Sequence, residues 1–306
     1  MTASVLYFRE NGKRQGEIIM DGINYWIHAV TPLHVGAGRG LGYIDMPIAR
    51  EKATNWPYIP GSSIKGVIAE YFGASEESIR NKEEHRDLKA AFGTSGSDNN
   101  CAAGALVFTD ADILCLPVRS FYGTFAWITS PFCLMRVKRD IDIPEFPEGI
   151  RALVANDSKL IREGGKIYLE DLDLKTQKSD EAGKIAESIA SSVFGENEKW
   201  QKVFAERFAI VNDDLFTFLC ESGTEVSAHI RIDGKTGIVQ DGALWYEEAL
   251  PAESILTGRV WCDKVFVSGI TEKDLFERFC SGIIDLQVGG KASTGKGIVR
   301  CIFGDR

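Results

Sequence analysis

The sequence predicts an α+β fold, and three observations lead to that prediction. Helix-like and strand-like patterns mix along the 306 residues without the repeating strand–helix unit of a doubly wound sheet. Apolar residues make up 44% of the chain, which is enough for a substantial core. Asp233 and Gly234 stand between two alternating runs, a strong signal for a β-hairpin. We therefore expect a single domain over residues 1–306 that contains a hairpin at 225–248.

The first predicted strand, residues 25–30, leads into a loop with glycines at positions 36, 38, 40 and 42. A helix should follow Pro60, with Gly61, Ser62 and Ser63 as its turn and N-cap. Its inward residues should be Ile64, Val67, Ile68 and Tyr71. Lys65 stands in the first turn, where the helix dipole favours an anion. Residues 31–66 are therefore interpreted as an anion-binding cleft with one acid, Asp45, in it.

The remaining elements follow from hydrophobic periodicity and from capping residues. Further helices are expected at 75–92, 131–139, 181–194, 213–220 and 271–280, and strands at 105–116, 123–128, 208–211, 225–232, 242–246, 255–267, 284–288 and 297–303. Asp110 and Asp112 should share one strand face, and a solvated face is favoured there over a metal site. Residues 140–204 contain prolines, paired glycines and many charges. We expect this segment to be an exposed, inserted lobe.

Charge and cysteine usage narrow the possible partners and the compartment. The chain has 35 Lys and Arg against 44 Asp and Glu, a net charge of −9. Broad non-specific affinity for nucleic acid needs a basic surface, so any RNA site must be a local patch. The seven cysteines are widely spaced, which indicates buried thiols in a reducing compartment. With no signal peptide and no long apolar run, the sequence predicts a cytoplasmic protein.

A second glycine-rich loop lies close to the C-terminus. The run Gly290-Lys-Ala-Ser-Thr-Gly-Lys-Gly297 nearly matches the nucleotide-binding pattern GxxxxGK[ST]. Gly297 replaces the hydroxyl that would hold Mg²⁺, however, and a strand rather than a helix is expected to follow. Nucleotide binding therefore remains a remote alternative. The preferred interpretation is that backbone N–H groups, Lys291 and Lys296 cradle a phosphate group.

Several of these motifs carry a family resemblance. The relevant residues are His34 and Asp45 around the first glycine loop, Leu41-Gly-Tyr-Ile-Asp-Met-Pro-Ile-Ala-Arg50, Ile59-Pro-Gly-Ser-Ser-Ile-Lys-Gly66, Thr224-Glu-Val-Ser-Ala228, Gly242-Ala-Leu-Trp-Tyr-Glu-Glu-Ala-Leu-Pro251 and the closing glycine loop. Together they resemble the RAMP superfamily of CRISPR proteins. Within it they are similar to the backbone subunit, the fourth subunit, of the type III-B (Cmr) effector complex. The resemblance covers most of the chain.

The resemblance implies a ferredoxin-like (RRM-like) core with large insertions. It implies a CRISPR RNA-binding backbone subunit for antiviral defence, which self-associates into a filament along the guide beside other Cmr subunits. Each copy would cut the paired single-stranded target RNA, as a metal-dependent endoribonuclease that uses Mg²⁺ or Mn²⁺ and the 2′-OH of the RNA. The alternative from the same superfamily is a guide-binding scaffold subunit that does not cut.

The resemblance also suggests site residues. Asp45 matches the family's cleavage aspartate and would be a general base or a metal ligand, whereas a lone loop aspartate could instead cap a turn. His34 and Glu247 are further catalytic candidates, with a structural role open for each. The predicted RNA contacts are Arg39, Arg50, Lys52, Ser62, Lys65, Gly290, Lys291 and Lys296.

The chain lacks the aromatic motifs with which ordinary RRM proteins stack bases. Sequence specificity would then come from base pairing with a guide. The hairpin is the first candidate for the family's thumb, which separates paired nucleotides. Residues 252–255 and the lobe at 140–204 are alternatives.

Overall fold

The computed structural model describes residues 22–38, 43–74, 82–94, 102–138, 144–162, 164–233 and 238–304. The strands are β1 (Gly22–Ala29), β2 (Tyr58–Ile59), β3 (Gly93–Thr94), β4 (Ala102–Ala103), β5 (Leu106–Phe108), β6 (Ala111–Arg119), β7 (Phe125–Thr129), β8 (Ala152–Val154), β9 (Lys166–Leu169), β10 (Leu172–Lys178), β11 (Phe208–Val211), β12 (Glu225–Ile232), β13 (Val239–Ala249), β14 (Ile255–Cys262), β15 (Ile283–Gln287) and β16 (Ile298–Phe303). The α-helices are α1 (Gly61–Tyr71), α3 (Arg86–Phe92), α4 (Pro131–Val137), α5 (Asp180–Phe194), α6 (Glu198–Ala205), α7 (Asp213–Ser222) and α8 (Glu272–Phe279), and the 3₁₀ turns are η1 (Glu83–His85) and η2 (Ala292–Thr294). Within these ranges no helix has the length and apolar character needed to cross a bilayer.

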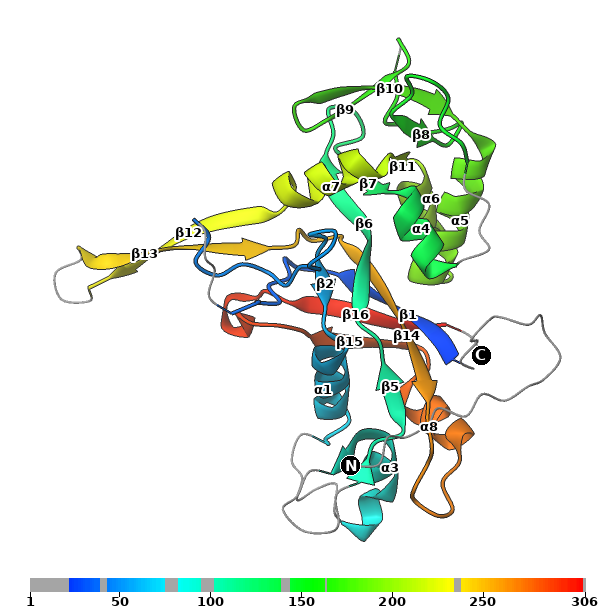
Figure 1. Cartoon of the computed structure of the whole chain (residues 1–306), viewed down its shortest axis with the longest axis vertical. Helices are drawn as coiled ribbons and strands as arrows, with labels where there is room; N and C mark the ends of the chain where they lie inside the picture. The colour runs from blue at the N-terminus through cyan, green and yellow to red at the C-terminus, as the bar shows by residue number, and fades with distance from the viewer. Residues whose placement is uncertain are drawn as a thin grey trace.

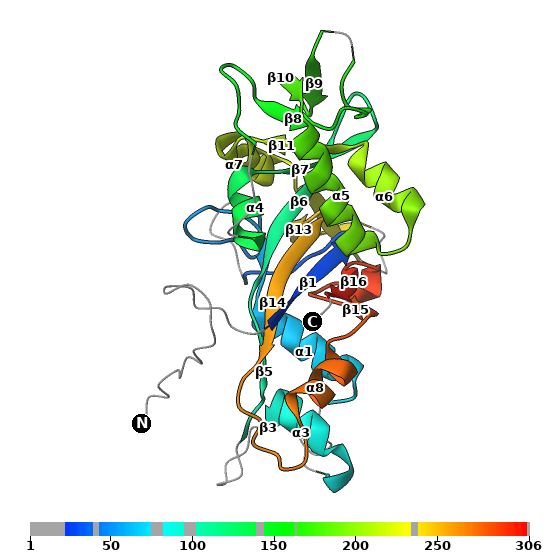
Figure 2. The ribbon, with the colours of Figure 1, turned by 90° about the vertical axis from the view of Figure 1, so that its right-hand side faces the viewer.

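Most strands join one 12-stranded sheet in the order β15-β16-β1-β14-β6-β7-β11-β8-β10-β9, with β2 on β6 and β5 on β14. Its centre is ferredoxin-like. The neighbours β16, β1, β14 and β6 are antiparallel, and in chain order they are the fourth, first, third and second strands of that fold. Helix α1 follows β1 and α8 follows β14, and Figure 2 shows both helices on the same side of β14 and β5. The predicted α+β, ferredoxin-like fold is confirmed.

Two long insertions interrupt this core. One, between α1 and β5, contains α3. The other lies between β6 and β14 and supplies everything from β7 to β13. Strands β7 to β11 extend the sheet into a lobe at one end of the molecule, while β12 and β13 project from its side as a separate hairpin (Figure 1). The segment 140–204 is more than a solvated appendage. Helix α5 buries Ile185, Ile189 and Phe194, and its Phe194 ring meets His28 of β1 at 5.4 Å.

Other expectations need correction. The predicted strand 105–116 is divided at Thr109 and Asp110 into β5 and β6, which both pair with β14, and the Asp110 carboxylate accepts a hydrogen bond from Gly61 N at 2.8 Å. The anion at the start of α1 is therefore the protein's own. Asp110 is exposed and Asp112 half-buried, and neither belongs to a group of three metal-ligating side chains among the described residues. Tyr71, predicted to point inward, is 53% exposed because α1 ends there.

The predicted helix 75–92 can be compared with the structure only from residue 82 onward. In the described part it consists of η1 and α3, and residues 75–81 lie outside the description. The cysteines in the described residues are free thiols and all but Cys262 are buried, while Cys101 lies outside the description.

Candidate functional site

The candidate site surrounds the base of the hairpin, where β13 contributes Tyr246, Glu247 and Glu248. Successive side chains of a strand point to opposite faces, so the two glutamates serve different neighbourhoods. The segment after the first glycine loop runs beside β13. Met46 N donates to Tyr246 O at 3.1 Å, and Glu248 N donates to Met46 O at 3.0 Å. This pairing positions Asp45 on the edge of β13, although 201 residues separate it from Tyr246.

Asp45 is exposed, and one of its two carboxylate oxygens is engaged in a hydrogen bond. Its Oδ2 accepts a hydrogen bond from the Tyr246 backbone N–H at 2.8 Å, which fixes the orientation of the carboxylate. Its other oxygen has no hydrogen-bond or ion-pair partner among the described residues. A held carboxylate with one free oxygen can accept a proton or contribute one ligand to a cation.

Glu247 is in the opposite situation, since it is only 1% exposed. Its carboxylate contacts Lys296 Nζ at 2.7 Å and Lys291 Nζ at 3.0 Å, both from the closing loop. Burial alone would raise the pKa of Glu247, but hydrogen bonds and charge from the two lysines outweigh burial and lower it. Glu247 is therefore a negative anchor for the loop. Because its carboxylate is ion-paired with both Lys291 and Lys296, Glu247 has little capacity to act as a base.

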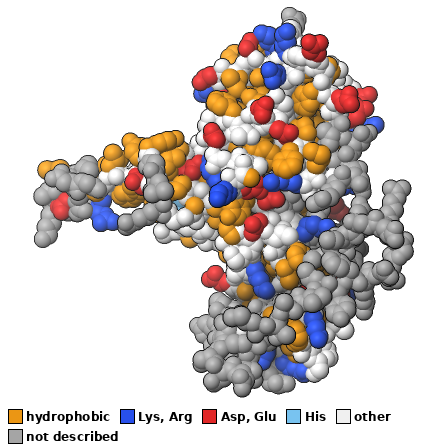
Figure 3. Space-filling model, viewed as in Figure 1, with side chains coloured by type: hydrophobic (Ala, Val, Ile, Leu, Met, Phe, Trp, Pro, Cys, Tyr) orange, Lys and Arg blue, Asp and Glu red, His pale blue; other side chains and the backbone are white. Residues whose placement is uncertain are grey.

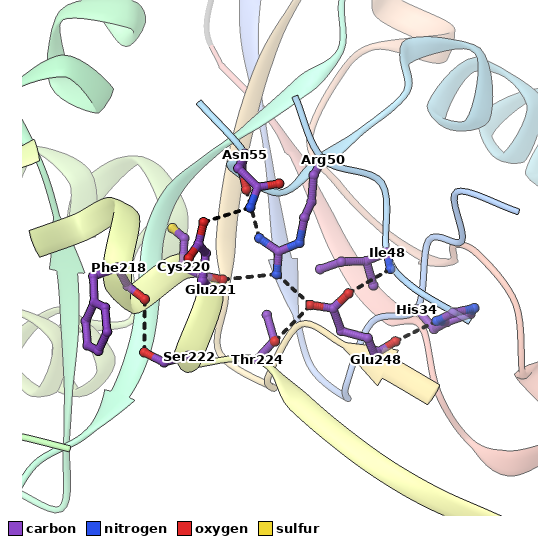
Figure 4. A network of polar contacts seen from close by, with 10 residues as sticks. All are labelled: His34, Ile48, Arg50, Asn55, Phe218, Cys220, Glu221, Ser222, Thr224 and Glu248. Carbon is purple, nitrogen blue, oxygen red and sulfur yellow. Dashed lines mark hydrogen bonds and ion pairs between the residues drawn. The ribbon is translucent and has the colours of Figure 1, made fainter. Parts of the chain in front are cut away.

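Glu248 anchors the other face (Figure 4). Its Oε1 accepts hydrogen bonds from Arg50 Nη2 at 2.5 Å and from Thr224 Oγ1 at 2.9 Å, and its Oε2 accepts one from Ile48 N at 3.1 Å. Arg50 also donates to the backbone oxygens of Asn55 and Cys220. The guanidinium thus joins the end of α7 and the loop after β1 to β13. Its predicted role in RNA binding stays a prediction, but the structure gives it an internal role.

His34 lies beneath the same strand and is 4% exposed. Its Nδ1 is 2.6 Å from Glu248 O. A carbonyl oxygen can only accept, so Nδ1 carries a proton and donates this bond. On its backbone side, His34 O accepts from Gly290 N at 2.9 Å. A Cβ on Gly289 would lie 2.2 Å from that oxygen, so this close approach requires glycine.

The closing glycine loop joins β15 to β16 in an antiparallel hairpin. Strand β16 follows it directly, so it lacks the strand–loop–helix context of a nucleotide-binding P-loop. Lys291 and Lys296 turn toward Glu247, with side chains 29% and 16% exposed. Their ammonium groups have three donors each, so a phosphate can still share them.

The other predicted RNA contacts are distributed differently. Lys52 is exposed and forms no hydrogen bond or ion pair with another described residue. Lys65 donates to Leu106 O at 2.8 Å, on the β5 side of α1, and Ser62 is exposed on the same helix. Arg39 lies outside the described residues. The structure therefore brings together Asp45, His34, Arg50, Glu247, Gly290, Lys291 and Lys296, and places Lys65 and Ser62 on another element.

A divalent cation would find limited support from the protein alone. No group of three or more metal-ligating side chains converges among the described residues. Asp45 can supply one oxygen, and Mg²⁺ often binds through one or two carboxylates together with substrate phosphates and waters. The described residues therefore offer one possible metal ligand, Asp45, but no complete all-protein metal centre.

The hairpin β12–β13 exposes an apolar face. Ala228 pairs with Tyr246, and Ile230 pairs with Leu244. Val226, Ile230 and Leu244 are 45%, 50% and 53% exposed, and Figure 3 shows apolar side chains gathered along this projection. An isolated two-stranded ribbon is marginally stable in water, so this face suits contact with another molecule. The expected turn falls at residues 234–237, outside the description.

Reasoning from the sequence missed the roles of Glu248 and Thr224. The predicted strand 242–246 ended before these acids, whereas β13 continues to Ala249 and its alternation puts adjacent acids on opposite faces. The partners of these acids come from segments far away in the sequence, and nothing local identifies them.

The fold and site define a ferredoxin-like protein with a glycine-rich closing hairpin and a held, exposed carboxylate. Comparison with known families shows the same class: the model of the RAMP superfamily matches residues 26–300. The chain belongs to the RAMP superfamily.

Individual relatives agree with this membership. The chain is 34% identical to the CRISPR system Cmr endoribonuclease Cmr4 of Pyrococcus furiosus, over 90% of this chain and 92% of that protein. The crystal structure of oligomeric Cmr4 from the same organism superposes with a TM-score of 0.67 at 27% identity, covering 94% and 99% of the two chains. A subunit of the type III-B Cmr-beta complex bound to cognate target RNA gives a TM-score of 0.70 at 19% identity, covering 92% and 96%, which indicates a shared fold.

Proposed function

We propose that this chain is the backbone subunit of a type III-B CRISPR effector, which binds guide RNA and cleaves the paired target RNA. The observation that carries the proposal is the contrast at the hairpin base. Asp45 is exposed and held by a backbone N–H, while the neighbouring acids are buried and neutralised. The extensive likeness to a relative named as an endoribonuclease supports the same reaction.

The chemistry follows from what these residues can do. Internal cleavage of RNA requires removal of the 2′-OH proton and stabilisation of charge on the phosphate. In the proposal Asp45 accepts that proton through its free oxygen, or contributes that oxygen to a cation. Lys291 and Lys296 provide positive charge beside the phosphate, and His34 positions the closing loop through its backbone oxygen. A divalent ion, Mg²⁺ or Mn²⁺, would supply further charge neutralisation when bound with Asp45 as one ligand.

The hairpin β12–β13 is the part of this chain that we propose contacts its partners. A relative has been crystallised as an oligomer, and the projecting apolar face offers this chain a means of contacting a neighbouring copy or an RNA strand. We propose that copies associate along the guide with other Cmr subunits, and that the hairpin acts as the thumb. Leu244→Ser should then disturb assembly or the spacing of cuts in reconstituted complex while leaving the monomer folded. Unchanged assembly and spacing would assign the thumb to another segment.

The central test is cleavage by a complex reconstituted from this chain, the other subunits and a guide of known sequence. A labelled complementary RNA should be cut at regular intervals, and a 2′-deoxy substitution at one cut site should abolish that cut alone. Cleavage that does not require the guide, or that is equal on DNA, would contradict the proposal. Purified chain that carries RNA of uniform 5′ sequence but never supports cutting would favour the scaffold function.

A further inference from the structure

A cluster of aromatic side chains stands exposed in the lobe that contains β9 and β10, apart from the site around Asp45. Phe121 is 79% exposed and Tyr168 is 38% exposed. The Phe121 ring centroid lies 4.9 Å from that of Tyr122 and 6.3 Å from that of Tyr168, and the two tyrosine rings are 6.1 Å apart. Three rings in mutual contact, with one almost wholly in solvent, form a surface suited to binding.

The turn that presents these rings is tightly fixed. Phe121 N donates to Tyr168 O at 3.1 Å, and Ser120 N donates to Thr124 O at 3.2 Å. Arg207 Nε donates to Gly123 O at 2.8 Å. Thr124 has φ +78°, a costly conformation for a β-branched residue. The aromatic rings are therefore held in advance on a rigid support, which lowers the entropic cost of binding.

A hollow of about 420 Å³ adjoins the cluster and is lined by Gly123, Ser158, Lys159, Ile161 and Arg162. The Arg162 guanidinium lies 5.4 Å from the centroid of Tyr122, and it makes no hydrogen bond or ion pair with any described residue. Lys159 pairs with the buried Glu206 at 2.6 Å, while its own side chain stays 55% exposed. The hollow thus combines an uncommitted cation with polar groups beside the rings.

We propose that this site binds a nucleotide of single-stranded RNA, with its base on the exposed face of Phe121 and its phosphate at Arg162. Aromatic rings next to cations are the elements that hold single strands without reading their sequence. A protein partner would also use aromatic residues, but the Arg162 guanidinium, which has no ion-pair partner among the described residues, and the half-exposed Lys159 favour an anionic group at the hollow. The site shares no residue with the Asp45 region, so it does not depend on the proposed function.

The test uses the full chain and a labelled ten-nucleotide RNA that contains 5-iodouridine. Photo-crosslinking should attach the RNA to the peptide that contains Phe121 and Tyr122. Phe121→Leu keeps apolar bulk but removes the ring, so it should abolish this crosslink and weaken binding about 5- to 100-fold. Arg162→Gln should weaken binding and lower the salt slope by about 1.

Phe266 is a matched control, because it is 62% exposed and lies 5.3 Å from a cation, Lys264. Phe266→Leu should leave affinity and crosslink unchanged. The proposal is overturned if wild-type protein gives no crosslink at Phe121 or Tyr122, or if Phe121→Leu and Arg162→Gln both bind RNA normally. Normal RNA binding by Phe121→Leu together with altered self-association would identify a protein-docking surface and overturn it equally.

Discussion

Asp45 and Glu247 lie beside each other at the base of one hairpin, yet they are held in opposite ways. Asp45 is exposed and takes one hydrogen bond from a backbone N–H, whereas Glu247 is buried between two lysines. Glu248 repeats the second pattern with Arg50. The difference separates two uses of an acid. A carboxylate that must take a proton or a metal needs a free oxygen, and a carboxylate that anchors chain segments needs committed cations.

The same comparison changes the meaning of the basic residues. Arg50 follows the first glycine loop, and Lys291 and Lys296 lie in the closing glycine loop, but each compensates a buried glutamate. Any charge that the two lysines offer a phosphate is shared with Glu247, and Lys52 remains the clearest exposed cation beside the site. A phosphate contact therefore cannot be inferred from the sequence position of a cation alone.

The largest effect should come from Asp45→Asn. The amide keeps the shape and can still accept the Tyr246 N–H, but it cannot act as a base or a strong metal ligand. Single-turnover cleavage should fall about 10²- to 10⁴-fold, while guide and target affinity stay nearly constant. The control is Asp285→Asn, which changes an exposed acid of β15. Near-normal cutting by Asp45→Asn would show that Asp45 is no more catalytic than Glu247. The chain would then be a scaffold subunit that does not cut.

Glu247→Gln should chiefly destabilise the fold. Removing the carboxylate leaves two lysines without their counter-charge, at a cost of about 3 kcal/mol in the free energy of unfolding. Because its pKa is lowered in the folded state, the stability from Glu247 is present above its ordinary value of 4.5 and is lost as the pH falls through the lowered pKa.

Chemical denaturation of Glu247→Gln and wild type at pH 7 and pH 3.5 measures both effects. The difference in free energy of unfolding between wild type and Glu247→Gln should shrink at the lower pH. Glu70→Gln, on the exposed side of α1, should behave like wild type at both pH values. A stable Glu247→Gln protein that has lost cleavage would instead make Glu247 catalytic.

The next comparison sets Arg50 against Lys52. Arg50→Lys keeps the charge, but a lysine cannot bond to Asn55 O, Cys220 O and Glu248 together. The free energy of unfolding should therefore fall by about 2 kcal/mol. The salt dependence of RNA binding should stay unchanged. Lys52→Met should leave stability within about 0.5 kcal/mol and lower the salt slope by about 1. The reverse pattern in denaturation and salt titration would assign the phosphate contact to Arg50.

Local physics explains which parts of the fold could be predicted. The hairpin β12–β13 follows from alternating residues around Asp233 and Gly234, and α8 begins at Glu272 after its N-cap Thr271, close to the predicted helix 271–280. The ferredoxin-like strand order could not follow from periodicity. It depends on pairings such as Trp26 with Thr257, which no local pattern encodes. The family resemblance supplied that order instead.

The candidate site, like the fold, could be predicted from the sequence only in part. The glycine loops could be singled out from their composition, whereas Asp45 was assigned a catalytic role only through the family resemblance. What each acid does depends on contacts across some 200 residues, such as Tyr246 N to Asp45 and Arg50 to Glu248. Burial and pairing decide whether a charge is available, and neither is visible in a single sequence.

The smallest effect concerns Asp112, an intermediate case between Asp45 and Glu247. Burial raises its pKa to about 6, Arg136 at 3.7 Å opposes this rise, and the charge of Glu51 adds to it. Arg136 is engaged mainly by Glu51, with bonds of 2.6 and 2.9 Å, so Asp112 is poorly compensated. A raised pKa means that the folded state holds its proton more tightly than the unfolded chain does. Its stability contribution is therefore full below about pH 4 and is lost as the pH rises through 6.

Asp112→Asn cannot titrate at this position. Its free energy of unfolding should therefore rise relative to wild type between about pH 4 and pH 6, by at most about 1 kcal/mol after solvent screening. Urea unfolding at pH 4.5, 6 and 7.5 measures the gain, with Asp171→Asn, an acid 99% exposed, as the control. Parallel profiles for Asp112→Asn and wild type would show that Arg136 compensates both acids. Asp112 would then belong with the anchored carboxylates, and the contrast with Asp45 would depend on exposure alone.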